Sequence, residues 1–247
     1  MNRCFWLWHA LFPALLFIAA ALVCARTDLD LQVANRFFDV ATGRWPYRDA
    51  WLTHTLLHDR GQLTIKLIGA GILLFWLCAW CWPRFRGYRR PASYLVLAIG
   101  LSTGLVSLGK AVSPVDCPWH LQRYGGEKPY IKLYAERPPS AKGGHCFPGG
   151  HSSGGFALFA FYFFWRERRP CLARFALSTA LLVGSVFALA QWARGAHFPS
   201  HDFYSAAICW GVCLGLYSAI LRPTPEAKAI SHRAANVFSS DTPTEGG

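Results

Sequence analysis

Two polar clusters separated by apolar sequence decide how this chain folds. Residues 147–154 read Phe-Pro-Gly-Gly-His-Ser-Ser-Gly, and residues 194–202 read Arg-Gly-Ala-His-Phe-Pro-Ser-His-Asp. Between them lie two apolar segments, separated by a short cationic stretch at residues 166–170, Arg-Glu-Arg-Arg-Pro. If each apolar segment crosses a bilayer once, both clusters emerge on the same face and can meet. We therefore expect the rest of the chain to hold these two clusters together.

The composition is that of an integral membrane protein. Hydrophobic residues make up 53% of the 247 residues and charged residues only 15%, and the apolar residues gather in long blocks. A helix of about 20 apolar residues spans the hydrocarbon core of a bilayer. Six blocks are visible, at residues 4–25, 63–83, 92–112, 151–165, 171–192 and 203–221. The sequence therefore predicts an all-α fold, a six-span transmembrane helical bundle.

The formal net charge of +12 indicates membrane topology rather than nucleic-acid binding. Lys and Arg lie mostly between the apolar blocks, where they mark cytoplasmic loops. With six spans, the cationic segments share one side, which we assign to the cytoplasm: Arg3, residues 84–90, residues 166–169 and Arg222. Both termini are then cytoplasmic, and residues 113–148 and 194–202 face outward, toward the periplasm if the membrane is a bacterial inner membrane. We expect one membrane domain at residues 1–221 and a polar cytoplasmic tail at residues 222–247, disordered by composition.

The connection after the first span is polar. Its amphipathic run at residues 29–38, followed by aromatic residues, is typical of a helix lying on the membrane surface. Three side chains here suggest a metal site, but a solvated or interfacial face is the better interpretation: His54, His58 and Asp59. Lys66 is expected near enough to the end of its span to extend toward the interface.

Two glycines and a lysine suit the binding of a phosphate group. A Gly-rich turn leading into a helix presents free backbone N–H groups to an anion, here at Gly149 and Gly150. Lys110 lies at the outer end of its span, where a charge without a function would be unfavourable in lipid. We expect all three residues to bind phosphate.

The histidines of the two clusters suit the cleavage of a phosphate ester. A neutral imidazole is a competent nucleophile when an acceptor holds its other nitrogen. His197 fits this role, with either His201 or Asp202, about one helical turn beyond it, as the acceptor. His151, at the start of a helix, suits the proton donor for the leaving oxygen.

These residues resemble the three-part signature of the type 2 phosphatidic acid phosphatase superfamily. Lys110 and Pro118 are similar to its first motif, residues 148–151 (Pro-Gly-Gly-His) to its second, and His197 with Asp202 to its third. The resemblance covers residues 92–215. It implies a membrane enzyme, largely six-helix in this family, that removes phosphate from lipids.

The chain departs from the family pattern at four positions. Cys117 stands where the first motif has Arg, and Gly149 replaces the Ser of the second. Gln191 occupies an Arg position of the third motif. His201 stands where that motif has Asp, and Asp202 comes one residue later.

Other basic residues are expected to replace the two missing arginines. Arg194 lies three residues after Gln191, about one helical turn, and could bring its guanidinium to nearly the same place. For the first motif, several cations of the outward loop could fold over the site: Arg123, Lys128, Lys132, Arg137 and Lys142. Arg123 is the first choice because it is closest in sequence.

Nine cysteines show no spacing typical of a structural zinc site. Only Cys117 and Cys146 fall in the outward loop. The family resemblance implies that their motifs meet around one phosphate, and an oxidising compartment lets a disulfide persist. We expect these two residues to be bonded, with two free thiols as the alternative.

The sequence therefore predicts an integral membrane phosphatase with its active site outside the cytoplasm. The expected substrate is a phosphorylated lipid (lipid A, a prenyl diphosphate or a phosphatidyl phosphate), cleaved through a phosphohistidine without metal, cofactor or nucleic acid. No carboxylate cluster suited to magnesium is evident. Two alternatives remain: a lipid phosphotransferase using the same site, and a non-catalytic lipid-binding protein, suggested by the missing arginines. The sequence indicates neither the particular lipid nor the oligomeric state.

Overall fold

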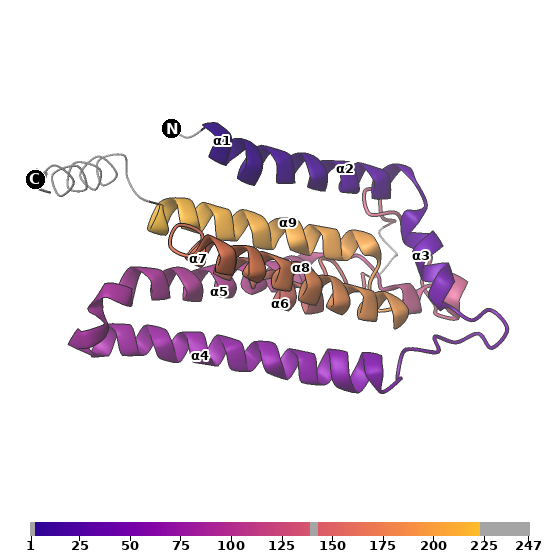
Figure 1. Cartoon of the computed structure of the whole chain (residues 1–247). Helices are drawn as coiled ribbons and strands as arrows, with labels where there is room; N and C mark the ends of the chain where they lie inside the picture. Colours follow the sequence, from indigo (N-terminus) through magenta and orange to yellow (C-terminus); the bar gives the residue numbers. More distant parts are fainter. Residues whose placement is uncertain (1–2, 139–142, 223–247) are drawn as a thin grey trace, which may run out of the picture.

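The computed structural model describes residues 3–138 and 143–222, and it confirms the all-α helical bundle (Figure 1). Lys142 and the predicted tail beyond Arg222 lie outside these ranges. Labels α mark α-helices, and labels η mark short helical segments of other pitch. In chain order the elements are α1 (Arg3–Trp6), η1 (Leu7–Leu11), α2 (Phe12–Arg26), α3 (Leu29–Phe37), η2 (Leu52–Arg60), α4 (Gly61–Cys81), η3 (Pro83–Tyr88), α5 (Arg89–Val112), η4 (Pro118–His120), η5 (Gln122–Tyr124), α6 (Gly150–Phe156), α7 (Phe159–Trp165), α8 (Pro170–Ala193), α9 (Pro199–Leu216) and η6 (Tyr217–Leu221).

Prolines set several of these boundaries. Pro83, Pro170 and Pro199 each occupy the first turn of a helix, where the missing N–H is no loss and the fixed φ suits the helix. The residue before a proline is also disfavoured in the α conformation. Consistent with this, α4 ends at Cys81, shortly before Pro83. Three of the helix boundaries therefore follow prolines in the sequence.

Five helical runs are long and apolar enough to cross a membrane: Arg3–Arg26, Leu52–Cys81, Pro83–Val112, Pro170–Ala193 and Pro199–Leu221. The chain is thus a multi-pass membrane protein. The predicted span at residues 151–165 corresponds to α6 and α7, two short helices separated by a turn at residues 157–158. Because this pair is too short to qualify by itself, the count of six crossings stays a prediction.

One helix begins much earlier than the hydropathy predicts. The expected boundary was residue 63, but η2 and α4 run without a break from Leu52 to Cys81. Lys66 therefore lies near the middle of this helix, about 20 Å from either end at 1.5 Å per residue. Because the first turns of this helix are polar, its membrane-spanning part begins after Leu52, and the expected approach of Lys66 to the interface stays a prediction.

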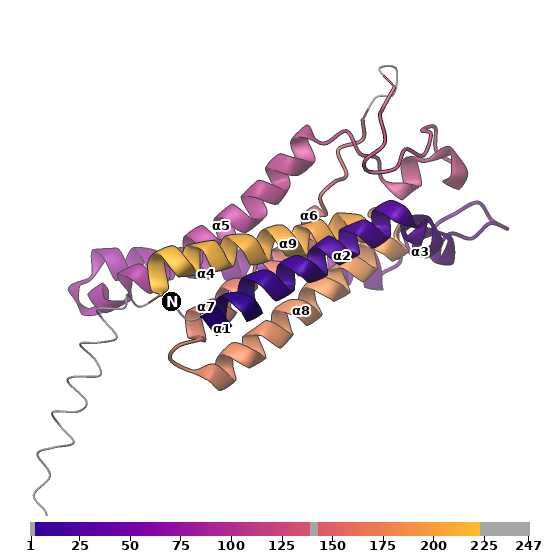
Figure 2. The same ribbon diagram turned by 90° about the horizontal axis from the view of Figure 1, so that it is seen from above.

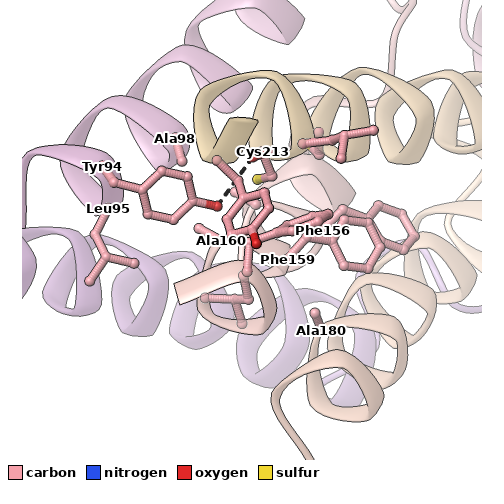
Figure 3. Packing of buried hydrophobic residues seen from close by; sticks show 14 of the residues in the cluster. Tyr94, Leu95, Ala98, Phe156, Phe159, Ala160, Ala180 and Cys213 are labelled. Carbon is pink, nitrogen blue, oxygen red and sulfur yellow. Dashed lines mark hydrogen bonds between the residues drawn. The ribbon is translucent and has the colours of Figure 1, made fainter. Parts of the chain in front are cut away.

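The core of the bundle is built where α5, α6, α7 and α9 meet (Figure 3). The Tyr94 hydroxyl of α5 donates a hydrogen bond to the Cys213 carbonyl of α9, at 3.3 Å. Helices α6 and α8 approach closely at Gly155, where a Cβ would lie 2.6 Å from the Cα of Gly184. In lipid, helices associate through such close packing of small residues rather than through the hydrophobic effect.

The outermost helices lie on opposite sides of the bundle (Figures 1 and 2). Helix α2 packs along α9, and α4 lies on the other side, against α5. None of the residues of α2 is buried, although the helix is apolar up to its last residue, Arg26. A helix that is apolar all round and exposed is suited to face lipid.

Cationic residues gather at the end of the bundle where α1 begins and α9 ends. The Arg166 and Arg222 guanidinium groups lie 4.4 Å and 4.5 Å from the centroid of the Phe5 ring. Arg90 donates to the Ile220 carbonyl at 2.7 Å. The cations predicted to share one side thus meet at one end, while α3 and the long loop lie at the other (Figure 2).

The long loop is held by covalent and ionic contacts. A disulfide joins Cys117 to Cys146, whose Cα atoms are 5.3 Å apart. Beside it, the buried carboxylate of Asp116 accepts from Lys128 at 2.8 Å and from Arg137 at 2.9 Å. The described part of the loop, residues 113–138 and 143–148, is therefore fixed at the end of the bundle.

Helix α3 is tied to the start of α9. The Asp30 carboxylate accepts from the Ser200 backbone N–H at 3.0 Å and from its hydroxyl at 2.7 Å. An acidic group is favourable at a helix N-terminus, where backbone N–H groups lack partners. Burial raises the pKa of Asp30, and the two bonds from Ser200 oppose that rise. The amphipathic segment predicted at the membrane surface therefore also positions α9.

Candidate active site

A cavity of about 710 Å³ opens at the end of the bundle where the long loop lies. Helices α4, α5, α6 and α8 line it, together with the segment between α8 and α9. It brings together four residues that the sequence predicted: Lys110, Gly150, His151 and His197. Segments separated by almost ninety residues thus meet at one place.

His197 is paired with Asp202. Its Nδ1 lies 2.9 Å from Asp202 Oδ1, and both side chains are buried. Asp202 also accepts from the Ser152 hydroxyl at 2.5 Å and from the Trp192 indole N–H at 2.6 Å. Because an ionised carboxylate only accepts hydrogen bonds, Nδ1 of His197 carries the proton. Its Nε2 is left with the lone pair.

His201 has a different environment. Its ring is buried edge-on between Phe147 and Phe198, with centroids 5.6 Å and 5.5 Å away. Its backbone carbonyl accepts the Gly149 N–H at 2.9 Å. Of the two acceptors left open by the sequence, the structure places Asp202 on His197, while His201 supports the turn before α6.

The Asp202 carboxylate lies where a side chain at position 149 would be. A Cβ on Gly149 would overlap Oδ1 of Asp202 and lie 3.0 Å from Nδ1 of His197. Because Gly149 replaces the Ser of the second motif, there is room for the Asp202 carboxylate. Asp202 lies one residue beyond the position where the third motif has Asp. Two departures from the family pattern compensate for each other.

The two glycines differ in what they offer an anion. The Gly149 N–H is already donated to the His201 carbonyl, so it is not free to bind phosphate. Gly150 lines the cavity, and a Cβ there would lie 3.9 Å from the Lys110 ammonium. The Gly149 N–H that was expected to bind phosphate thus already has a backbone partner, whereas Lys110 and Gly150 lie together at the cavity wall.

His151 is enclosed by aromatic rings and a carbonyl. Its Nε2 lies 2.9 Å from the Leu57 oxygen, and its ring contacts Phe187 at a centroid distance of 4.6 Å. The His58 ring stacks on it at 4.7 Å and 12°, and His58 lines the cavity. His58 is thus a site residue that the interfacial interpretation missed. Had the helix been predicted to begin at Leu52, His58 would have been placed one turn before Gln62, on the same helix face.

Gln191, rather than Arg194, faces the cavity. Arg194 is buried behind it, donating from Nε to the Arg48 carbonyl at 3.0 Å and from Nη1 to Gln191 Oε1 at 3.4 Å. The amide Nε2 of Gln191 is buried without a hydrogen-bond partner, and the residue lines the cavity. The guanidinium therefore fixes the amide oxygen and leaves the buried amide N–H groups without a partner beside the cavity.

The cations of the long loop do not reach the cavity in the described part of the chain. Arg123 is exposed on η5 and is not among the lining residues. Lys128 and Arg137 are paired with Asp116, and Lys132 lies 3.0 Å from Asp28. The structure thus brings none of these four to the first-motif position.

One trio of potential metal ligands occurs among the described residues: Cys117, His120 and Cys146. Two of its members form the disulfide, so they offer no thiolate, which is the form of cysteine that binds metals. We therefore interpret these three residues as part of the disulfide-linked loop and not as a metal site.

The comparisons with known proteins give one match. A family model described as the PAP2 superfamily matches residues 91–224, just over half of the chain. No curated protein and no solved structure matches the chain.

The overlap at Gly149 gives a direct test of the site. Gly149→Ala and Gly149→Ser should lower the rate of phosphate release by about 100-fold or more, because the new side chain displaces the carboxylate that orients His197. The comparison is Gly150→Ala, where a Cβ would meet nothing nearer than 3.8 Å and the loss should be far smaller. Equal losses at the two positions would contradict this assignment.

Gln191 and Arg194 are expected to act as a unit. Gln191→Ala should lower kcat by roughly 100-fold, since it removes a fixed donor facing the phosphoryl group. Arg194→Ala should act in the same direction, and Arg194→Lys should rescue poorly without the forked donor geometry. In the Gln191→Ala background, Arg194→Ala should add little. Independent, additive losses would show that Arg194 does not work through the amide.

Proposed function

The chain belongs to the PAP2 superfamily, a family of phosphatases, and we propose on that premise that it removes phosphate from a phosphorylated membrane lipid. The family assignment confirms the resemblance seen in the motifs. The observation that carries the proposal is the buried His197–Asp202 pair beside a cavity that also holds Lys110 and His151. A phosphate ester bound there meets a nucleophile, a cation and a proton donor together.

The first step forms a phosphohistidine. Nε2 of His197 attacks phosphorus, the N–P bond forms and the bond from phosphorus to the leaving oxygen breaks. His151 gives its proton to that oxygen, while Asp202 stabilises the positive charge on the His197 ring. In this proposal Lys110, the Gly150 backbone N–H and the Gln191 amide hold the equatorial oxygens.

The second step releases phosphate. Water attacks the phosphohistidine, His151 takes its proton, and the N–P bond breaks to return His197 to the neutral form. The Leu57 carbonyl fixes Nε2 of His151, which leaves Nδ1 to carry the transferred proton. The charge is supplied by Lys110 and amide donors, and Asp202 is fully engaged by three donors, so we propose a reaction without metal.

The predicted membrane orientation supports an active site outside the cytoplasm. Arg90, Arg166 and Arg222 meet at the end of the bundle where α9 finishes, whereas His197 lies just before α9 begins at Pro199, at the opposite end of this helix. Cytoplasmic loops carry the excess of Lys and Arg. On this rule the cationic end is cytoplasmic, and the cavity opens toward the periplasm of a bacterial inner membrane.

The function is tested by phosphate release from detergent-purified protein with chelator present, across phosphatidic acid, polyprenyl diphosphates and lipid A. At least one lipid should release inorganic phosphate. His197→Ala should abolish the release and any acid-labile phosphoenzyme, because the nucleophile is gone. His201→Ala should retain a measurable rate, because the backbone carbonyl that supports the turn is kept and the His201 side chain does not hold His197.

The controls separate the alternatives. If an added lipid alcohol gains the phosphate in place of water, the protein is a phosphotransferase using the same residues. Lipid binding without release or transfer from any lipid in the panel would contradict an enzyme and favour the binding protein. An active His197→Ala with a dead His201→Ala would show that the third motif is wrongly aligned.

A further inference from the structure

His58 lies at the cavity, but the proposed reaction gives it no role. It belongs to η2, it lines the cavity, and its side chain is 33% exposed. The segment η2 is wound as a π-helix, and segments of this kind are found frequently at functional sites. The contacts of the His58 ring indicate what it does there.

Two successive residues of η2 hold the proton donor. The Leu57 carbonyl lies 2.9 Å from His151 Nε2, and because a carbonyl only accepts, this nitrogen carries a proton. The His58 ring lies nearly parallel to the His151 ring, with centroids 4.7 Å apart and planes 12° apart. The carbonyl therefore fixes which nitrogen of His151 reacts, and the His58 ring fixes the plane of the imidazole.

The packing of η2 on α8 keeps this arrangement in place. Gly61 follows directly after η2, and a Cβ there would lie 2.8 Å from the Phe187 ring of α8. The same ring contacts His151, with centroids 4.6 Å apart and a tilt of 45°. Because Gly61 has no side chain, Phe187 can contact both the helix and the proton donor. His151 is thus held by rings from two different helices.

His58 is itself held by a carboxylate. Its Nδ1 lies 3.2 Å from Asp59 Oδ1, and because an ionised carboxylate only accepts, Nδ1 is the donor. His197 and Asp202 have the same arrangement, an imidazole whose Nδ1 faces a carboxylate. A nearby negative charge favours the protonated form of a ring, and the exposed part of His58 lets water supply the second proton. Asp59 therefore stabilises a positive charge on His58.

Two imidazole rings in contact do not become charged independently. A positive charge on one ring disfavours a positive charge on the other, and such a pair releases its protons in two coupled steps. Because Asp59 favours the proton on His58, His151 holds its own second proton less firmly. A donor that releases its proton readily is the stronger acid toward a leaving oxygen.

The other groups around the two rings have been included in this comparison. The charged and titratable groups that face them are His54 and Asp59 on η2, Arg194 after α8 and His197 before α9, with Lys66 and Lys110 lining the same cavity on α4 and α5. Of these groups only Asp59 is acidic, and it contacts His58.

We propose that His58 is a positioning residue for the proton donor His151. Its ring holds the His151 imidazole in one plane, and its positive charge, stabilised by Asp59, makes His151 a stronger acid. His58 itself forms no bond to phosphorus or to the leaving oxygen. The inference rests on the proposed function, in which His151 protonates that oxygen, and it adds a residue outside the three motifs.

The pH dependence of kcat/KM separates the effect of the ring from that of the charge. Its basic limb reports loss of the proton that His151 donates. His58→Phe keeps a ring but removes the charge, so His151 should keep its proton to higher pH and the limb should move up by about one pH unit. The rate at the optimum should change little. His58→Ala also removes the ring and should lower the maximal kcat by about tenfold, because the donor is no longer held in plane.

The matched control is His54→Phe. His54 lies four residues earlier, its ring centroid is 6.0 Å from that of His58, and it is not among the described residues that line the cavity. This change should move the basic limb far less. A His58→Phe profile that superimposes on the wild-type profile would overturn the effect of the charge. Equal maximal rates for His58→Phe and His58→Ala would overturn the effect of the ring.

A titration without substrate keeps this inference separate from the proposed function. Purified protein with isotope-labelled histidine would be titrated in detergent and followed by NMR, with the His151 signal assigned by its loss in His151→Gln. The midpoint of His151 should rise in His58→Phe. If no lipid in the panel releases phosphate, the proposed function fails, while this midpoint still decides whether the two rings are coupled. An unchanged midpoint would overturn the coupling even in an active enzyme.

Discussion

The hydrogen bond between His197 Nδ1 and Asp202 Oδ1 is the contact on which the rest of the site depends. The carboxylate lies at the start of α9 and the imidazole in the preceding turn. The bond therefore forms only if neighbouring residues fix the positions of both side chains. Trp192 of α8 and Ser152 of α6 hold the carboxylate from two other helices. The packing of α6, α8 and α9 therefore sets the tautomer of His197. A shift of any of these helices changes the chemistry available at Nε2.

The turn between α8 and α9 is constrained for the same reason. The backbone N–H groups of Ala196 and His197 donate to the Gln191 carbonyl, at 2.9 Å and 3.3 Å. Gly195 has φ of 73°, and a Cβ there would lie 2.5 Å from the Trp45 ring. Gln191 thus holds the nucleophile's loop with its backbone and faces the cavity with its side chain. The neutral Gln191 therefore lines the cavity at the position where the family has Arg.

Much of the fold and part of the site could be predicted from the sequence. Long apolar blocks give the membrane helices directly, because burial in lipid requires them. Lys110, His151 and His197 could be identified because each belongs to one of the three motifs, and each motif lies where a predicted helix begins or ends. Hydropathy failed at η2, where polar residues such as His58 continue a helix. That error hid the polar residues of this helix that line the cavity, such as His58 and Gln62.

The remaining differences come from local geometry that spacing does not contain. Arg194 was expected one helical turn from Gln191 and does contact it, but its guanidinium is held behind Gln191 by the Arg48 carbonyl. Asp202 reaches His197 despite its offset, because α9 begins at Pro199 and Gly149 leaves space for the carboxylate. Such compensation between distant positions is visible only when the segments are placed together in space.

The position of the phosphoryl group on the trapped intermediate tests the central claim most directly. Enzyme quenched during turnover at alkaline pH, where phosphohistidine survives, would be digested and the modified nitrogen identified by NMR and mass spectrometry. Because Asp202 occupies Nδ1, the account predicts phosphorylation of His197 at Nε2. A phosphoryl group on Nδ1 of His197, or on any other residue, would contradict it.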